Sequence, residues 1–428
     1  MRTWNRTIGA LGATALACVL SGGTGWADDQ GAPAPAPAAA PTDPTRGQWD
    51  SFLDPLRDVE DDYVTDFQKK IEDITKIHFS AGLTEAYLWD FNDPGSGSLI
   101  PLHSMEHHND GTPAFGQIAA SRPSEGWFVP GFGVKLDYGK GARDIKSDWN
   151  GDGAVNHGDV FETNDFDAEE AYLTWTVPDD GPSALKGLSI KGGKFVTLLG
   201  AEVIEPWANF NYSRSLLFSL AIPFTNTGVL VSYPITDKLS ITGGPIVGWD
   251  KVTTSNNGWS GMGNLTYTAN DQLTLSSSLI FGPEQVNKVG AKREVVDLVA
   301  TYKPAQISAL TLLLNYDYGH EDDAALDVAG NAAYWQGFAA VGNYNLTDRA
   351  SVAVRGEWFE DHGGSRTGLS QTVYEGTLTG KYLITQHLYG QVEYRHDESG
   401  KRAFATSSNT IFLPGQDILG FDVTYVFN

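Results

Sequence analysis

Cysteine is almost absent from this sequence. The single residue of that type, Cys18, lies in an apolar stretch close to the N-terminus. A disulfide framework needs cysteines in pairs, and thiolate metal sites need several together. Both kinds of stabilisation are therefore excluded for the rest of the chain.

Basic residues are also scarce, because 29 Lys and Arg stand against 53 Asp and Glu, which gives a formal net charge of −24. Phosphate binding needs a basic footprint, so nucleic acid is not an expected partner. Beyond residue 27 there is no apolar run of 18 residues, so no transmembrane helix is expected. A chain without such a helix can still cross a membrane as a closed β-barrel, which pairs every backbone polar group internally.

Catalytic motifs are missing as well. The sequence contains no nucleophile elbow, no phosphate loop and no zinc-binding His-Glu-x-x-His pattern. Its Ser, His and acidic residues show no spacing that favours a catalytic triad. We therefore expect a protein that is not an enzyme.

The first 27 residues have the features of a secretory signal peptide. Arg2 and Arg6 precede an apolar core at 8–20, and small residues around Ala27 offer a cleavage site. A lipoprotein signal ending at Cys18 is the alternative, although the small and large residues before it stand in the wrong order. We expect the mature chain to begin at about residue 28.

Two segments precede the main domain. Residues 28–46 form a Pro/Ala-rich linker that cannot pack as a domain. Residues 47–76 are acidic, with apolar side chains every three or four positions, which predicts an amphipathic helix. We expect this helix in the periplasm. It could pack against the rim of a barrel, pair as a coiled coil or plug the lumen, and these alternatives stay open.

From residue 77 to residue 428 the hydrophobic period is two, which is typical of strands. In the last strand Leu419, Phe421, Val423 and Tyr425 alternate with small or polar residues. The apolar faces repeatedly end in aromatic residues, as in the interfacial girdles of membrane barrels. We expect an all-β fold, a transmembrane antiparallel β-barrel of about sixteen strands. The expected strands are 77–91, 112–121, 129–138, 168–177, 186–197, 227–235, 239–249, 259–268, 272–281, 294–303, 307–318, 332–345, 350–359, 372–383, 387–396 and 416–427.

The connections alternate in length. Short turns occur at 236–238, 270–272, 347–349 and 385–387, with longer polar loops between them. Short periplasmic turns and long extracellular loops are typical of outer-membrane barrels, and an even strand number places both termini in the periplasm. Glu85 falls on the lipid-facing side of the first strand, which leaves a local register error as an alternative.

One long loop carries a calcium-like pattern, DWNGDGAVNHGD. It places oxygen ligands at Asp148, Asn150, Asp152, the carbonyl of Ala154, Asn156 and Asp159. Hard Ca²⁺ takes six to eight oxygens, and this spacing wraps them around one centre. Helices do not flank the loop, so it is similar to the dockerin-type variant. We expect structural Ca²⁺ in an extracellular loop, with a coincidental acidic, glycine-rich loop as the alternative.

A second loop holds His103, His107 and His108, three imidazoles that could ligate a transition metal. An ordinary exposed polar loop is the preferred interpretation.

Segment 199–226 is too apolar for a loop bathed in solvent. A loop folded into the lumen explains this composition, with Glu202, Glu205 and Arg214 narrowing the pore. The alternative is an uncounted strand at 216–224. One face of three later strands carries further charges that point to a wet interior and a transverse field. They could equally pair with one another and brace the wall. These charges include Arg355, Glu357, Glu375, Lys381, Glu393 and Arg395.

Several stretches resemble the OmpL-like putative β-barrel porin family of Gram-negative bacteria. They include EAYLTWTVP at 170–178, GKFVTLLGAEVIE at 193–205, NYSRSLLFSLAIPFTNTGVLVSY at 211–233 and RGEWFEDHGGSRTG at 355–368. The resemblance covers most of 77–428. It implies an outer-membrane porin without catalytic residues and without a defined solute, and it does not extend to the linker, the helix or the calcium-like loop.

The expected function is thus an outer-membrane channel for passive diffusion of small hydrophilic solutes or ions. Its expected surroundings are outer-membrane lipid and lipopolysaccharide, and the acidic balance suggests cation preference. Barrels of this size often form trimers, so a homotrimer is a candidate by analogy. Two other functions stay open: a structural or interaction barrel closed by its own helix and loop, and an outer-membrane hydrolase.

Overall fold

The computed structural model describes residues 69–95, 114–150, 165–178, 180–408 and 410–427. The segments expected to be signal peptide and linker, and residues 47–68 of the expected helix, lie outside these residues and remain predictions. Residues 69–75 are helical and mostly exposed, and they lead into the first strand. Within the described ranges no helix is both long and apolar enough to span a membrane.

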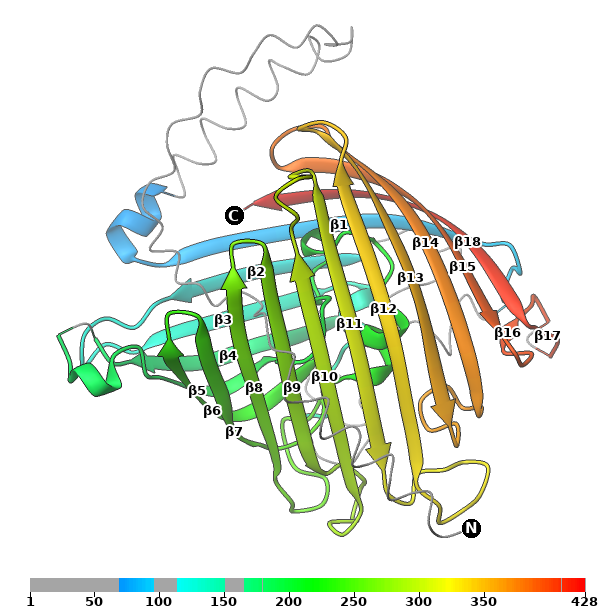
Figure 1. Ribbon diagram of the computed structural model, residues 1–428, viewed down its shortest axis with the longest axis horizontal. Coiled ribbons are helices and arrows are strands. Elements are labelled where there is room, and N and C mark those ends of the chain that lie inside the picture. The colour runs from blue at the N-terminus through cyan, green and yellow to red at the C-terminus, as the bar shows by residue number, and fades with distance from the viewer. Residues whose placement is uncertain (1–68, 96–113, 151–164, 179, 409, 428) are drawn as a thin grey trace, which may run out of the picture.

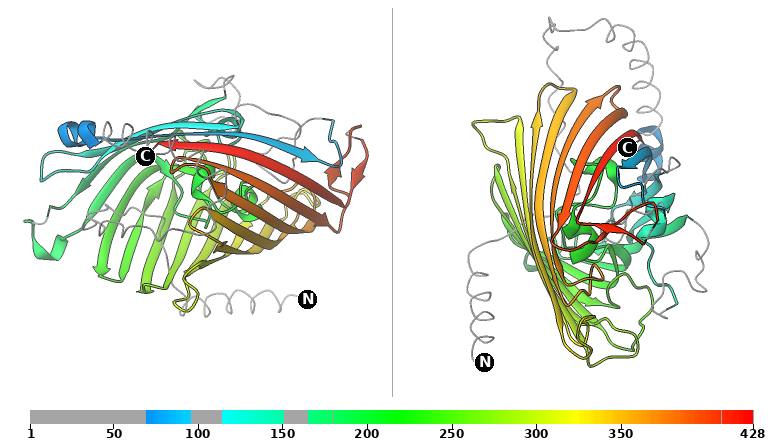
Figure 2. Two further views of the ribbon diagram at one scale, coloured as in Figure 1. Left: turned by 90° about the horizontal axis from the view of Figure 1, so that it is seen from above. Right: turned by 90° about the vertical axis from the view of Figure 1, so that its right-hand side faces the viewer.

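Sixteen strands form one closed antiparallel barrel, in which each strand pairs with its neighbours in the chain and β1 closes the ring on β18 (Figures 1 and 2). The strands β16 (Phe404–Ala405) and β17 (Phe412–Leu413) form a separate small hairpin before β18. The barrel strands are β1 (His78–Asp90), β2 (Phe115–Arg122), β3 (Gly131–Tyr138), β4 (Phe166–Thr176), β5 (Ser189–Val196), β6 (Thr225–Thr236), β7 (Leu239–Ile246), β8 (Ser260–Asn270), β9 (Leu273–Pro283), β10 (Lys292–Tyr302), β11 (Leu310–Glu321), β12 (Ala333–Asn345), β13 (Ala350–His362), β14 (Gln371–Leu383), β15 (Leu388–Ser399) and β18 (Gly415–Phe427).

The predicted fold is confirmed strand by strand, because each of the sixteen expected segments overlaps one barrel strand. The alternation of side chains explains why. Along each strand, successive residues point to the lumen and to the outside, so the sequence period of two marks every wall segment. Even the segment at 112–121, with few large apolar residues, forms β2.

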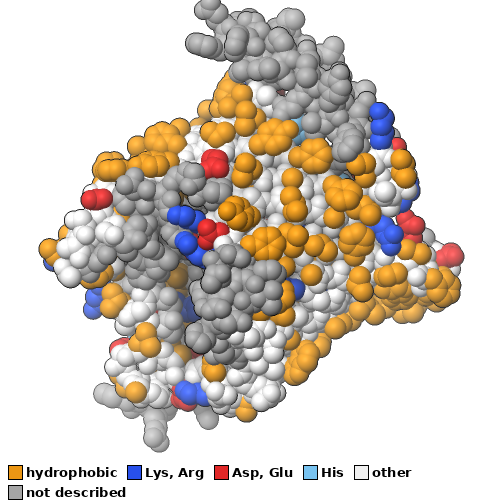
Figure 3. Space-filling model, turned by 180° about the vertical axis from the view of Figure 1, so that it is seen from behind, with side chains coloured by type: hydrophobic (Ala, Val, Ile, Leu, Met, Phe, Trp, Pro, Cys, Tyr) orange, Lys and Arg blue, Asp and Glu red, His pale blue; other side chains and the backbone are white. Residues whose placement is uncertain are grey.

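Glu85 lies on the outer face of β1, together with Leu83 and Tyr87. Its Cα partner on β18 is Val423, which also faces outward. The register expected from the sequence is therefore right at this position, and a carboxylate does face outward. Elsewhere the outer surface is mainly apolar, and Figure 3 shows one such face with few charged side chains among the hydrophobic ones.

The two ends of the barrel differ. At one end, here called the short-turn end, connections such as 237–238 and 271–272 contain few residues, and the helical residues 69–75 and the C-terminus also lie there. Its connection 177–188 is longer and includes η1 (Ser183–Leu185). The opposite end, the long-loop end, carries the longer connections, including the one with α3 (Lys140–Asp144) and the one with the β16–β17 hairpin.

The main hydrophobic core lies inside the barrel. Apolar side chains of residues 197–224, the connection between β5 and β6, pack against wall residues including Trp335 and Phe359. Within this connection η2 (Pro206–Ala208) is a 3-10 turn and η3 (Leu217–Ala221) a π-helical turn. The alternative of an uncounted strand at 216–224 is therefore wrong. The apolar content belongs to a loop that needs a dry surface to pack on, and the inner wall supplies it.

Candidate functional site: a loop clamped inside the barrel

Residues 197–224, called the inserted loop from here on, leave β5 at the long-loop end and turn into the barrel interior (Figure 2). The start of the loop is tied to the wall, because Ser278 donates to the carbonyl of Leu198 at 2.8 Å and Ala201 N–H donates to Asn315 at 3.2 Å. At its end, the Asp250 carboxylate accepts the N–H groups of Phe224 and Thr225 at 2.8 and 2.9 Å.

Two arginines of the wall hold the middle of the loop. Arg355 on β13 donates to Glu202 at 2.9 Å and to the carbonyl of Ser213 at 2.6 Å. Arg395 on β15 donates to the carbonyl of Arg214 at 2.6 Å and also pairs with Asp397 of its own strand. Each guanidinium is about 1% exposed. The N–H groups of both guanidinium groups therefore bind the loop and the wall rather than water.

Two wall carboxylates bind the same part of the loop through its backbone. Glu357 accepts the N–H of Leu216 at 2.8 Å, and Glu393 accepts those of Tyr212 and Ser213 at 2.8 and 2.9 Å. The charge rows expected from the sequence therefore do lie together on the inner face of β13–β15. There they clamp the inserted loop, with cations on its carbonyls and anions on its N–H groups.

Arg214 itself turns back into the loop. Its guanidinium donates to the carbonyls of Val203, Ile204 and Tyr212, and the residue is 1% exposed. Glu202 accepts the N–H of Ser215 at 2.7 Å in addition to its contact with Arg355. These two predicted constriction residues thus fix the shape of the loop, and Arg214 presents almost no charge to water.

Glu205 of the inserted loop contacts the opposite wall, formed by β3 and β4. Its carboxylate lies 2.5 Å from the ammonium of Lys135 on β3, which also contacts Glu169 at 3.2 Å and Glu170 at 3.3 Å on β4. Burial opposes ionisation of Glu205, but the Lys135 ammonium outweighs it and holds the pKa of this carboxyl below its usual value. The Lys135 side chain keeps 25% exposure, so it faces the remaining lumen.

Carboxylates outnumber lysines in this region. Five acidic side chains, Asp137, Asp167, Glu169, Glu170 and Glu205, lie near the three lysines Lys135, Lys191 and Lys194, so acidic groups outnumber basic ones there. The sequence showed Lys135 and Asp137 only as the polar face of one strand. Their connection to Glu205, 70 positions away from Lys135, becomes visible only in the closed barrel.

Open space remains beside the inserted loop. A gap of about 230 Å³ separates the loop from the inner faces of β10, β11 and β12. Its lining is mixed: apolar residues such as Phe210, Leu313 and Val341 stand beside polar ones, which are Glu202, Asn209, Asn211, Thr301, Lys303 and Thr311. On the side of β1 and β2, Trp207 of η2 packs against Phe115, with ring centroids 5.8 Å apart.

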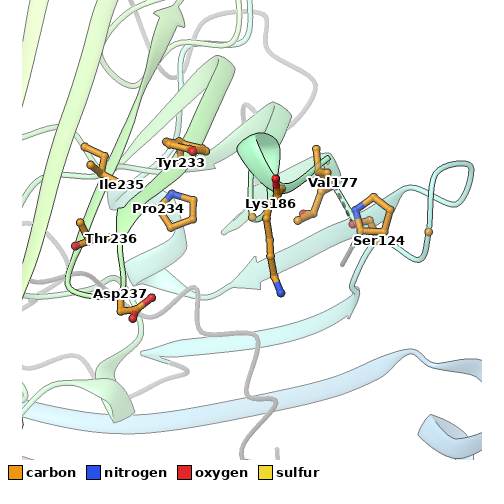
Figure 4. A pocket seen from close by; sticks show the side chains of 13 residues that line it. Ser124, Val177, Lys186, Tyr233, Pro234, Ile235, Thr236 and Asp237 are labelled. Carbon is orange, nitrogen blue, oxygen red and sulfur yellow. Dashed lines mark hydrogen bonds between the residues drawn. The ribbon is translucent and has the colours of Figure 1, made fainter. Parts of the chain in front are cut away.

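Two further features lie away from the loop. Lys381 of β14 is half-buried, and its ammonium lies 3.7 Å from the centroid of the Tyr389 ring. A separate pocket of about 560 Å³ opens at the short-turn end, where Lys186 and Asp237 come from two neighbouring connections (Figure 4). Neither feature contacts the clamp described above.

The expected metal ligands are only partly described. Asp148 is buried, and its backbone bonds to Asp250 and Val252, while Asn150 ends the described stretch. Asp152, Ala154, Asn156 and Asp159 lie outside the described residues, as do His103, His107 and His108. The calcium-like loop and the histidine cluster therefore remain predictions.

A sixteen-stranded barrel with an apolar outer surface and a loop folded into a polar lumen defines a porin-like outer-membrane protein. The comparison with family models agrees, since the model described as "Putative beta-barrel porin-2, OmpL-like" matches residues 76–427. The chain belongs to this family. Among curated proteins, none is significantly similar to it in sequence.

Solved porin structures share the fold. OmpF of Salmonella typhi, in a complex with daunomycin, superposes with a TM-score of 0.54 at 12% identity, covering 82% of this chain and 97% of that one. The outer membrane channel DcaP of Acinetobacter baumannii gives 0.53 at 10% identity, with 82% and 97% covered. An anion-selective porin from Comamonas acidovorans gives 0.50 at 11% identity, with 82% and 99% covered. At such low identities the likeness concerns the fold alone.

Proposed function

We propose that the protein is a passive channel of the outer membrane for small hydrophilic solutes or ions, and that it has no catalytic activity. The observation that carries the proposal is the inserted loop, clamped across a polar lumen by Arg355, Arg395, Glu357 and Glu393. A clamped loop restricts the cross-section of the channel while the barrel wall stays intact. The gap beside β10–β12 is the proposed passage past it.

The proposed preference is for cations. Acidic side chains outnumber lysines around Lys135, next to the loop. Charged walls of low dielectric raise the local concentration of counter-ions, so this region would favour cations over anions. Glu205 supports the proposal, because its pKa is held low and it stays ionised near neutral pH.

The remaining parts of the proposal concern the surroundings. The long-loop end would face the cell exterior and its lipopolysaccharide, and the N-terminal segment would lie in the periplasm. The loop at 148–159 would hold Ca²⁺ as a structural ion, and three copies of the barrel would assemble by analogy with other porins. A barrel closed by its own loop is the second candidate, because the inserted loop contacts both walls.

The reversal potential across a planar bilayer in a salt gradient tests the selectivity. A potential of the sign expected for cation permeation supports the proposal. A reversal potential of the opposite sign, measured on a conducting protein, contradicts the cation preference but still supports the proposal that the protein is a channel. If neither the wild type nor variants with substitutions in the clamp residues conduct, the result favours a barrel closed by its own loop.

A further inference from the structure

A groove of about 530 Å³ lies where β7, β8 and β9 run side by side, and it ends beside the first residue of β10. Trp259, Leu279 and Phe281 line it, and these side chains are 62%, 47% and 47% exposed. On β9 they alternate with Ser278, which points into the lumen and binds the inserted loop. The groove therefore opens on the outer, lipid-facing surface of the barrel, in its half nearest the long loops.

Glycines form the floor of this groove. In the barrel register Gly261 of β8 stands between Pro245 of β7 and Phe281 of β9, and all three line the groove. No atom of the described residues lies within 4 Å of the place that a Cβ at Gly261 would take. The two strands that flank β8 lie about 10 Å apart. Once their own side chains are in place, the space above the glycines accommodates a single hydrocarbon chain.

The end of the groove nearest the long loops is polar. It is lined by Lys292, whose ammonium donates to the carbonyl of Val289 at 2.8 Å and so uses one of its three N–H groups. Glu294, the Cα partner of Phe281, is also exposed there, and its carboxylate lies 3.9 Å from the imidazole of His320 on β11. An apolar channel thus leads up to one cation and one carboxylate.

We propose that this groove binds lipid A, the phosphorylated glycolipid anchor of lipopolysaccharide. One acyl chain lies over Gly261 between Pro245 and Phe281, where it gains van der Waals packing that a flat wall does not offer. The Lys292 ammonium binds a phosphate group, and Glu294 accepts hydrogen bonds from sugar hydroxyl groups. The choice of lipid A rests on the proposed function, because it requires the long-loop end to face the cell exterior.

A second copy of the barrel is the alternative occupant. The charge at the end of the groove favours the lipid, since a lipid brings a flexible chain and an anionic head group in one molecule. A rigid barrel wall would have to present both a ridge that fits the groove and an anion opposite Lys292.

The test measures binding of purified lipid A to the full-length protein in detergent by native mass spectrometry, with phosphatidylglycerol as competitor. We expect one lipid A per chain, bound in preference to phosphatidylglycerol. Gly261→Leu fills the floor and should weaken binding at least about tenfold, which corresponds to 1.4 kcal/mol. The matched control is Gly376→Leu on β14, because Gly376 is another exposed glycine with no described atom within 4 Å of its Cβ position. This control should bind lipid A as the wild type does.

A second pair of variants tests the head group, with dephosphorylated lipid A as an additional probe. The wild type should prefer the phosphorylated form. Lys292→Met should remove this preference, and Lys238→Met at the short-turn end should keep it.

Four results would overturn the proposal. G261L binds lipid A as tightly as the wild type, or G376L loses it equally. K292M keeps the preference for the phosphorylated form. Phosphatidylglycerol binds at least as tightly as lipid A. The wild type binds no lipid but self-associates while G261L is monomeric, which identifies a second copy as the occupant. If G261L fails to fold, Gly263→Leu on the same floor replaces it. Conductance does not enter this test, so failure of the lipid site and failure of the channel proposal are distinguishable.

Discussion

Removal of the Arg355 guanidinium should release the inserted loop. Substitution Arg355→Met keeps most of the side-chain volume but removes the donors to Glu202, to Ser213 and to the carbonyl of Arg214. It also leaves the wall carboxylates Glu357 and Glu375 without this cation. The barrel strands keep their backbone pairing, so the change falls on the docking of the loop.

The size of the effect follows from burial. Removing one partner of a buried ion pair costs about 3–5 kcal/mol, since the remaining charge stays desolvated. Each 1.4 kcal/mol is a factor of ten in an equilibrium constant. The ratio of docked to undocked loop should therefore fall by roughly two to three and a half powers of ten. Part of this free-energy cost concerns Glu375, which stays in the wall whether the loop is docked or undocked. We therefore expect the smaller of these decreases in the docking ratio.

Single-channel recording in planar bilayers provides the assay. R355M should show a larger conductance step and more open-channel noise than the wild type, because the undocked loop widens and perturbs the passage. Lys238→Met is the matched control, since it removes an exposed charge at the short-turn end, where the Lys238 ammonium donates to the carbonyl of Ala269. A folded R355M barrel with wild-type conductance and noise would refute the clamp.

Three further predictions concern selectivity, pH and calcium. Lys135→Met removes a cation from the acidic cluster and should shift the reversal potential further toward cation permeation, while K238M leaves it unchanged. Burial raises the pKa of Asp250 from 3.8 to about 6; the stability that this shift contributes is fully present below pH 3.8 and lost as the pH rises through about 6. Thermal unfolding of the wild type should therefore lose stability relative to Asp250→Asn between pH 4 and pH 7, and parallel profiles would contradict this. Asp148→Asn with Asp152→Asn should reduce the calcium dependence of the unfolding temperature, and unchanged dependence would count against the calcium-like loop.

The sequence predicted the barrel well because wall strands repeat a local signal. In a strand with one face in lipid and one in the lumen, apolar and polar side chains must alternate. Each of the sixteen segments shows this alternation in its own sequence, without any long-range information. The inserted loop was also detectable, since its apolar residues make sense only on a dry surface. Residues 216–224 could not be assigned to strand or loop, because a short apolar run fits both.

Side-chain partners were less predictable, because they depend on register and closure. Arg214 looked like a pore residue, but its donors are used by carbonyls of its own loop. The pairing of Asp297 with Asp317 requires the exact offset between β10 and β11. The contact between Lys135 and Glu205 requires a loop that crosses to another wall. A local sequence pattern does not predict contacts between residues that lie so far apart in the chain.

The central claim is that this barrel conducts past a clamped loop. Planar-bilayer recording of the purified full-length protein, beside a form without residues 28–76, tests it most directly. Discrete channel steps are expected in both proteins, with cation permeation dominant in a salt gradient. No steps in either protein, with folded barrels inserted in the bilayer, would contradict it.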